Sequence, residues 1–469
     1  MREENKVLYQ KLYDFVREAV GVLSKTLNMG EIQILSRHNI ERKDNMIFLY
    51  GGDDWRKIEG LRSLANLTSL KEITDVCKRH EQIKSLNGKW SYAFDFGSSF
   101  TAENVPISFL LELLSRQTGC RLSKNLFDKV FNLFLGYISA KDECYARVVA
   151  PLDNMQITGK VIDLGHDSRI RRLSAREHEE LESYCPVLGV FYGTFFSPQF
   201  QCILEFDIPF QWSWVVREEN DARPFIQVTS SRARYQAVKR RINEEIVILR
   251  ALMNHAVSAP TYFIDYRGWR HLDFAGGVIN QLPWVRPSIP ASEEIKVKEI
   301  TKYRRYRERF LQMKGREAQR IFVAMRKLAF GMDKPYSGDQ IMDMVSGLEG
   351  LLVGEDTEVR HKFAERVALL LGKTVKQRLS LQKDMKDAYD FRSKVAHGLV
   401  MTDEIDSLVS QASIGHKLTQ KQLGELKIVL KLRLLTRSLL HQAILVCIDR
   451  QTTNFDWDLA LLSSRLTHP

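Results

Sequence analysis

The chain has 469 residues, of which 44% are hydrophobic and 27% are charged. This composition excludes a disordered chain, and the length is enough for two or three domains. Its 69 lysines and arginines outnumber its 58 aspartates and glutamates, and the formal net charge of +11 is compatible with a polyanionic partner.

Apolar side chains recur every three or four residues in the first part of the chain, as they do along one face of a helix. One such set consists of Leu8, Leu12, Phe15, Val16, Ala19, Val20 and Leu23. A second set lies within residues 105–135, and between the two sets residues 90–96 alternate like a short strand. We therefore expect residues 1–135 to form a mostly helical N-terminal region.

From about residue 140 the apolar pattern changes to a period of two, which is typical of strands. Strands are predicted at residues 145–150, 155–157, 160–162, 170–173, 190–196, 201–206 and 212–216. A capping box predicts a short helix at 174–181, and a basic helix is expected at 231–256. Prolines and tryptophans predict an irregular stretch and a domain boundary at 260–290. We expect residues 136–290 to form a β-rich domain.

Beyond residue 291 the pattern is helical as far as Asp449. Two Thr-x-x-Gln patterns, at Thr374 and Thr419, predict the starts of two long helices, and Gly372 predicts the end of the helix before them. Four or five amphipathic helices with short loops indicate a helical bundle at 291–469. The expected fold class is α+β, with a mixed helical and β-rich N-terminal region followed by an all-α bundle.

The most informative pattern is Arg-x4-His, from Arg392 to His397, at the end of a helical stretch. A guanidinium suits a phosphate, and a histidine can move a proton near neutral pH. Five residues of regular helix turn about 500°, so the two side chains share a face only if the helix ends near His397. Gly398 predicts such an end. Taken alone, the pattern also fits a structural role, with Arg392 paired to Asp390 or Asp387 and His397 capping the last carbonyls of the helix.

This pattern resembles the Arg-x(4-6)-His signature of HEPN domains, and the run from Arg392 to Gly398 looks like the Apea-like branch. Helices at 341–352 and 363–371 resemble that branch in order and spacing, so the resemblance covers about residues 300–455. It implies that Arg392 holds the scissile phosphate and that His397 is the general acid or base.

Three further residues have supporting roles in this reading. Many HEPN nucleases carry Asn after the Arg, where this chain has Ser393, whose hydroxyl can also donate and accept a hydrogen bond. Glu349 is expected to orient Arg392, and Asp390 is a second supporting carboxylate. The alternative for both carboxylates is an ordinary core or surface role.

The resemblance implies a metal-independent endoribonuclease that cleaves RNA through attack of the 2′-hydroxyl, with a site built by a homodimer. It also implies a toxin-like effector of antiphage defence by abortive infection. Residues 136–290 loosely resemble sensor-like regions ahead of Apea-like domains, so a phage-derived trigger or a regulatory partner is expected. The alternative is a catalytically inactive HEPN module that dimerises and binds RNA or a partner protein.

A basic set consisting of Lys302, Arg304, Arg305 and Arg307 is interleaved with tyrosines. Basic side chains bind phosphates and tyrosines stack on unpaired bases, so this set is the predicted RNA-binding surface. The alternative is a solvated face without a ligand.

No metal and no cofactor is expected, because the 11 histidines lack ligand spacing and no phosphate-binding glycine loop is present. The six cysteines form no Cys-x-x-Cys pair and are expected to be buried thiols. Without a signal core at the first residues or an apolar run of about 18–20 residues, we expect a cytoplasmic protein with no membrane partner.

Overall fold

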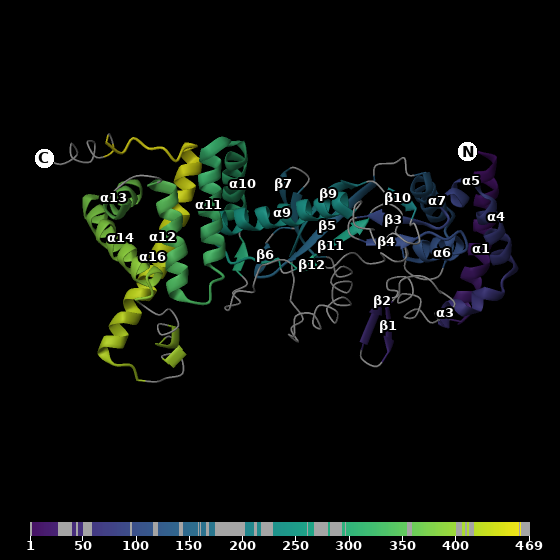
Figure 1. Ribbon diagram of the computed structural model, residues 1–469, viewed down its shortest axis with the longest axis horizontal. Coiled ribbons are helices and arrows are strands. Elements are labelled where there is room, and N and C mark those ends of the chain that lie inside the picture. Colours follow the sequence, from purple (N-terminus) through teal and green to yellow (C-terminus); the bar gives the residue numbers. More distant parts are fainter. Residues whose placement is uncertain are drawn as a thin grey trace.

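Helices form both ends of the molecule, and a six-stranded sheet lies between them (Figure 1). The computed structural model describes residues 2–26, 40–43, 46–49, 59–93, 96–115, 121–139, 144–157, 159, 161–165, 168–173, 202–210, 213–216, 228–259, 261–266, 280–281, 293–295, 297–353, 359–399, 406–408, 410–411, 417–458 and 460. The predicted helix at 174–181 and strand at 190–196 lie outside these residues. The fold is of the mixed α+β class.

The N-terminal end is a cluster of helices. It contains α1 (Glu3–Thr26), α3 (Glu59–Arg62), the 3-10 helix η2 (Ser63–Asn66), α4 (Thr68–Arg79), α5 (Glu81–Leu86), α6 (Val105–Ser115) and α7 (Lys124–Ser139). All seven apolar side chains that predicted the first helix are buried. That prediction is confirmed, because the helical period places them on the one face of α1 that meets the other helices.

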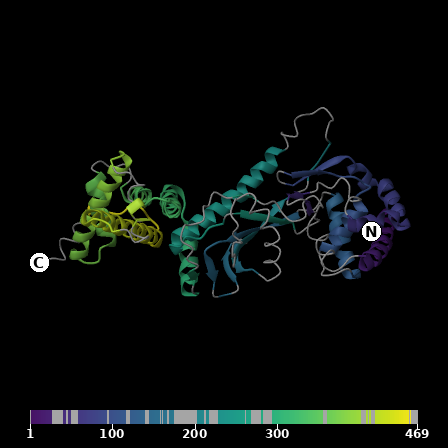
Figure 2. The same ribbon diagram turned by 90° about the horizontal axis from the view of Figure 1, so that it is seen from below.

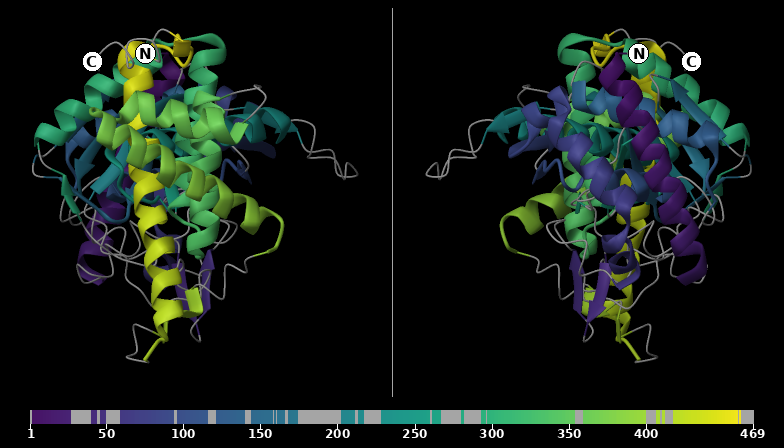
Figure 3. Two further views of the ribbon diagram at one scale, coloured as in Figure 1. Left: turned by 90° about the vertical axis from the view of Figure 1, so that its left-hand side faces the viewer. Right: turned by 90° about the vertical axis from the view of Figure 1, so that its right-hand side faces the viewer.

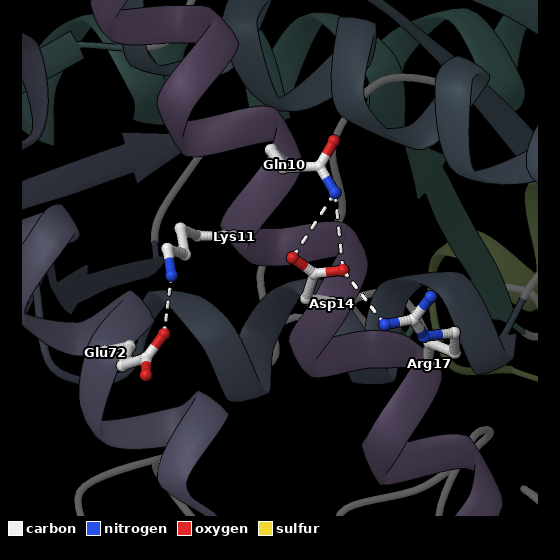
Figure 4. Close-up of polar contacts among 5 residues, drawn as sticks. All are labelled: Gln10, Lys11, Asp14, Arg17 and Glu72. Carbon is white, nitrogen blue, oxygen red and sulfur yellow. Dashed lines mark hydrogen bonds and ion pairs between the residues drawn. The ribbon is translucent and has the colours of Figure 1, made fainter.

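Helix α1 has a buried apolar face and an exposed polar face, and both contact neighbouring helices. Its buried side meets aromatic rings of α7, with Tyr9 edge-on to Phe127 at 5.1 Å between ring centroids. Its exposed side carries polar contacts, of which the Lys11 ammonium donates to Glu72 of α4 at 2.6 Å (Figure 4). The same figure shows Asp14 accepting hydrogen bonds from Gln10 and Arg17 along α1. Exposed pairs of this kind contribute little, so the aromatic face dominates.

The large sheet has the strand order β12-β11-β5-β9-β8-β7, and every neighbouring pair is antiparallel. Its strands are β5 (Cys144–Leu152), β7 (Val161–Gly165), β8 (Ser168–Arg172), β9 (Cys202–Phe210), β11 (Thr261–Tyr266) and β12 (Asn280–Gln281). β11 pairs with β5 along Phe263 to Tyr266. The expected irregular stretch at 260–290 is therefore wrong at 261–266 and at 280–281, where β11 and β12 continue the sheet.

Smaller sheets join segments that are distant in sequence. β3 (Lys89–Ala93) pairs with β4 (Phe96–Ser99) and with β10 (Ser213–Val216), which follows β9. β6 (Met155–Ile157) pairs in parallel with β13 (Glu293–Ile295). The remaining pair is the hairpin of β1 (Ile40–Lys43) and β2 (Met46–Leu49).

The long helix α9 (Val228–Met253) runs from the sheet to the C-terminal helices (Figures 1 and 2). The middle of α9 lies on the sheet, where the Arg241 guanidinium is 4.2 Å from the Phe206 ring and donates to Ser168 at 2.9 Å. Its second half packs against the bundle helices α10, α11 and α16, and Arg250 there is fully buried. The predicted helix is present, but its basic side chains are partly structural.

The C-terminal bundle is formed by α10 (Val297–Gln312), α11 (Gly315–Gly331), α12 (Ser337–Leu352), α13 (Val359–Leu371), α14 (Val375–Ala396) and α16 (Gln420–Arg450). α12 contacts α11, α13, α14 and α16, and the long α16 contacts each of the other five bundle helices (yellow in Figure 3, left). Both predicted helix starts are confirmed. The Thr374 hydroxyl accepts from the Gln377 amide, and Thr419 with Gln422 forms a complete capping box.

Three cysteines, Cys77, Cys202 and Cys447, are buried free thiols, as expected. Burial raises their pKa to about 12, about 11 and about 12 respectively. A thiol that stays protonated is a poor nucleophile. The side chains of the other three cysteines lie outside those that the structure describes.

We predict that Tyr9→Phe removes a stabilising contact that depends on alkaline pH. The Tyr9 hydroxyl donates to Asp128 at 2.5 Å, and this hydrogen bond, with burial, raises the pKa of Tyr9 from 10.0 to about 12. Because the pKa of Tyr9 is raised, this contact stabilises the folded protein fully below pH 10. That stabilisation is lost as the pH rises from 10 towards 12, where the hydroxyl ionises. Urea unfolding should show wild type more stable by about 1–2 kcal/mol at pH 8. A difference that persists at pH 12 would contradict this account.

Candidate functional site

The Arg-x4-His pattern lies at the C-terminal end of α14. His397 is the first residue beyond the helix, with φ −92° and ψ 5°, and Gly398 follows with φ +69°. The amide of Gly398 donates to the Val395 carbonyl at 3.0 Å, and the amide of Leu399 donates to the Lys394 carbonyl at 2.8 Å. These two bonds define a Schellman motif, so the predicted helix end at Gly398 is confirmed.

Arg392 is held between α14 and α12. Its Nη2 lies 3.6 Å from Oε2 of Glu349, and the two side chains are 29% and 23% exposed. The guanidinium carbon also lies 5.6 Å from the ring centroid of Tyr389, one turn earlier on α14. The Tyr389 ring in turn packs against Phe363 of α13 at 5.8 Å. Three helices therefore restrict the Arg392 side chain while leaving part of it open to solvent.

Asp390 is paired with a residue that the sequence did not indicate. Oδ1 of Asp390 accepts from Nε of Arg360 on α13 at 2.6 Å, and a second hydrogen bond makes the pair bidentate. The hydrogen bond and charge of Asp390 raise the pKa of the Arg360 guanidinium. Arg392 therefore does not take Asp390 as its ion-pair partner, and the structural alternative in which they pair is wrong.

His397 is exposed and free to meet a ligand, since it lies outside the regular helix. Ser393, one turn earlier, is half-buried, and its carbonyl accepts from the His397 amide at 3.0 Å. Among the described residues, Arg392 and His397 share no hydrogen bond or ion pair. The helix end thus presents an anchored cation and an unanchored imidazole, which together can bind an anion and transfer a proton.

The predicted basic set on α10 divides into an exposed and a buried part. Lys302 and Arg305 are exposed, Arg304 is half-buried, and Arg305 lies 3.9 Å from Asp449 of α16. Arg307 is only 3% exposed and is surrounded by acceptors within the protein. The expectation that Arg307 binds RNA is therefore wrong.

Arg307 instead ties α10 to α9 and to the sheet. Its Nε donates to Glu245 of α9 at 3.1 Å, Nη2 donates to the same carboxylate, and Nη1 donates to the Leu164 carbonyl of β7. Burial opposes its charge, but the hydrogen bond and charge of Glu245 outweigh burial and raise the pKa of Arg307. Its role is structural, because leaving this pair to bind a ligand would leave a buried charge unpaired, which is strongly destabilising.

The interleaved tyrosines are also part of the core. Tyr303 is 3% exposed and Tyr306 is 8% exposed, so neither can stack on a base without leaving its place. Burial raises the pKa of Tyr303. Arg305 and Lys302 instead lie over the Tyr306 ring at 4.9 and 5.9 Å. The expectation of base stacking at this helix is wrong, and what remains is a small exposed basic surface.

Residues 2–460, apart from the gaps given above, contain no group of three or more His, Cys, Asp or Glu side chains that could hold a metal ion. In the same described residues, no helix combines the length and apolar content needed to cross a membrane. Comparison with protein-family models, curated proteins and solved structures gives no match for this chain.

Sequence reasoning missed Arg250 and Arg360 for different reasons. Arg250 interrupts the apolar run from Ile246 to Met253, and a lone arginine in such a run is a usable signal for a buried, paired charge. Arg360 carries no such signal, because its partner Asp390 lies 30 residues away on another helix.

We predict that Arg307→Met destabilises the protein by about 3–5 kcal/mol, because it leaves the Glu245 carboxylate buried and unpaired. The matched control is Arg305→Met, which changes an exposed cation on the same helix and should cost less than about 1 kcal/mol. Both values can be measured by urea unfolding followed by circular dichroism.

The double variant Glu245→Met/Arg307→Met should recover much of the loss, because it removes both buried charges together. Equal stability of Arg307→Met and Arg305→Met would contradict the role of the Arg307–Glu245 pair in holding α10 against α9.

Proposed function

We propose that this protein is a metal-independent endoribonuclease of the HEPN class, with Arg392 and His397 as its catalytic pair. The observation that carries the proposal is the helix end itself. Arg392 is oriented by Glu349 but remains 29% exposed, and His397 lies exposed just beyond the last turn of the same helix. Arg250 and Arg307, by contrast, are buried among acceptors of the protein and are closed to a ligand.

The proposed reaction needs a base, an acid and a stabilised phosphate. His397 takes the proton of a ribose 2′-hydroxyl, the 2′-oxygen attacks the adjacent phosphorus, and the 5′-oxygen leaves with a proton. Arg392 stabilises the additional negative charge on the phosphoryl oxygens in the transition state. The products are a 2′,3′-cyclic phosphate and a 5′-hydroxyl, and no bound metal or cofactor takes part in these steps.

One imidazole cannot accept a proton and donate another at the same moment. A homodimer that brings two α14 ends together supplies a second His397 and a second Arg392 for the same phosphate. We place the dimer interface next to the motif, where Leu399 is 74% exposed. The biological role proposed with this activity is that of a toxin-like effector of antiphage defence, restrained or triggered through the N-terminal part of the chain.

The second candidate function is a HEPN module that dimerises and binds RNA or a protein without cleaving it. It is favoured by the pairing of Arg392 with both Glu349 and Tyr389, which gives the arginine a structural contact as well. The two candidates differ in their need for His397, because a binding module does not require a proton carrier.

We predict that Arg392→Ala and His397→Ala each lower RNA cleavage by about 10²–10⁴-fold with unchanged circular dichroism and sizing profiles. Both side chains act on the transition state, so RNA affinity should change little. Cleavage should survive EDTA, and His397→Ala should remove toxicity in cells. The measurement is gel analysis of a labelled RNA incubated with each purified variant.

Two matched control variants test whether removing any exposed histidine or arginine is enough to lower RNA cleavage. His361→Ala removes an exposed histidine of α13, and Arg17→Ala removes an exposed arginine of α1. Both should cut like wild type. Wild-type cutting by either Arg392→Ala or His397→Ala would overturn the catalytic assignment in favour of the binding module.

The affinity for RNA should fall as the salt concentration rises, because the exposed cations Lys302 and Arg305 of α10 would contact phosphates. Each lost phosphate contact to a single strand reduces the slope of log affinity against log salt by about 0.7. We therefore expect the double variant Lys302→Ala/Arg305→Ala to reduce the slope by up to about 1.4. Fluorescence anisotropy at several salt concentrations measures this, and an unchanged slope would identify the surface as a solvated face.

We also expect a homodimer in solution. Leu399→Glu places a charge in the proposed interface and should weaken the dimer by about tenfold or more, since burying a leucine is worth about 1.5–3 kcal/mol. Light scattering across a concentration series measures the dissociation constant. A wild-type protein that is strictly monomeric at micromolar concentration and fully active would contradict the composite site.

A further inference from the structure

The end of α9 is joined to α11 by a fully buried guanidinium. Arg250 donates through Nη1 to the Ala329 carbonyl at 2.8 Å and to Oδ2 of Asp333 at 2.6 Å, and its Nε donates to the Val257 carbonyl. The same side chain therefore binds the segment that follows α9 and the C-terminal end of α11. We call residues 252–258 the connector segment.

Helix α16 holds the connector segment from a second direction. Arg437 donates to Oδ1 of Asn254 at 2.9 Å and to its carbonyl at 2.7 Å. Nε2 of His441, one turn further along α16, lies 3.2 Å from the Leu252 carbonyl oxygen. Asn254 has a left-handed backbone, with φ +56°, so the chain reverses where Arg437 binds it. The His441 ring thus lies against a carbonyl at the end of α9, and the Arg437 guanidinium satisfies the Asn254 carbonyl just beyond it.

The other side of the connector segment is bonded to the large sheet. The amide of Asp153 donates to the Ser258 carbonyl at 2.8 Å, and the amide of Ser258 donates to the Asp153 carbonyl at 3.2 Å. Nδ2 of Asn154 donates to the Ala256 carbonyl at 3.3 Å. Asp153 and Asn154 form the turn between β5 and β6. A seven-residue segment is thus bonded to the sheet on one side and to two bundle helices on the other.

The same two helices fix the position of α12. A Cβ atom added at Gly347 would lie 2.8 Å from Leu440 of α16 and 3.1 Å from Lys327 of α11, so α12 approaches both helices closely. Two residues later, Glu349 meets Arg392. A packed core responds to displacement by shifting between arrangements rather than by stretching. A change in the seating of α16 on the connector segment therefore reaches the carboxylate that orients Arg392.

We propose that the connector segment is a coupling element through which the state of the large sheet sets the position of Arg392. In the seated arrangement Arg437 holds Asn254, α16 and α11 fix α12, and Glu349 orients Arg392. In the released arrangement the connector leaves Arg437, and α12 loses its fixed position. The consequence for catalysis rests on the proposed function, whereas the mechanical coupling does not.

The test is hydrogen exchange on the full chain, followed by mass spectrometry. Asn254→Gly removes the side-chain acceptor from the connector itself, and its left-handed backbone suits glycine, so the fold is retained. Arg437→Met removes both donors. Losing a hydrogen bond to a charged group should speed exchange of peptides covering Glu349 and Arg392 by about tenfold in Arg437→Met, and by less in Asn254→Gly.

Matched controls exist for both changes. Gln451→Gly makes the same kind of backbone change at another left-handed position, with φ +54°, at the far end of α16. Lys427→Met removes an exposed cation from α16. Both controls should leave exchange at Glu349 and Arg392 as in wild type. Faster exchange confined to the connector segment in Asn254→Gly and Arg437→Met would overturn the coupling.

Cleavage assays on the same proteins separate this inference from the proposed function. If wild type does not cut RNA while exchange still spreads from Asn254 to Arg392, the coupling stands and the nuclease proposal fails. If wild type cuts RNA and exchange at Arg392 does not respond to either variant, the nuclease proposal stands and the coupling fails.

Discussion

A guanidinium that water cannot reach must find its acceptors within the protein, and Arg250 finds them in two parts of the chain. Its hydrogen bonds join Val257, beyond its own helix, to Ala329 of α11 and to Asp333, two residues beyond the end of α11. Breaking a buried pair of this kind costs about 3–5 kcal/mol, so α9 and α11 stay together. Because α9 also covers the sheet, this one side chain fixes the sheet relative to the bundle. Arg307 makes a second such tie.

The elements that sequence predicts best depend on contacts between residues that are near in the chain. The face of α1 follows from residues three or four apart, and the start of α16 follows from Thr419 and Gln422. The strand β11 was missed because its partner β5 lies more than a hundred residues earlier, while Pro260 beside it favoured a loop. Arg307 looked like a surface cation for the same reason, since its partner Glu245 is 62 residues away.

The candidate site shows the same division between local and distant contacts. Gly398 alone was enough to predict how α14 ends, because a left-handed C-cap is a property of that residue. The approach of Glu349 to Arg392 was expected from the family resemblance and agrees with the geometry. The bidentate pair of Asp390 with Arg360 could not be predicted, because it depends on how α13 lies against α14. In the proposed dimer, the two α14 ends meet through contacts between chains, and the sequence of one chain does not specify them.

If the α14 end cleaves RNA by activating the neighbouring 2′-hydroxyl, a substrate that lacks this group resists cleavage. An RNA oligonucleotide is first cut by the wild-type protein in EDTA, and its cleaved position is mapped. The same oligonucleotide is then made with a single 2′-deoxynucleotide immediately 5′ to that position. We expect a 2′,3′-cyclic phosphate and a 5′-hydroxyl from the first substrate, and no cutting at that position in the second. Equal cutting of the deoxy-substituted position would contradict it.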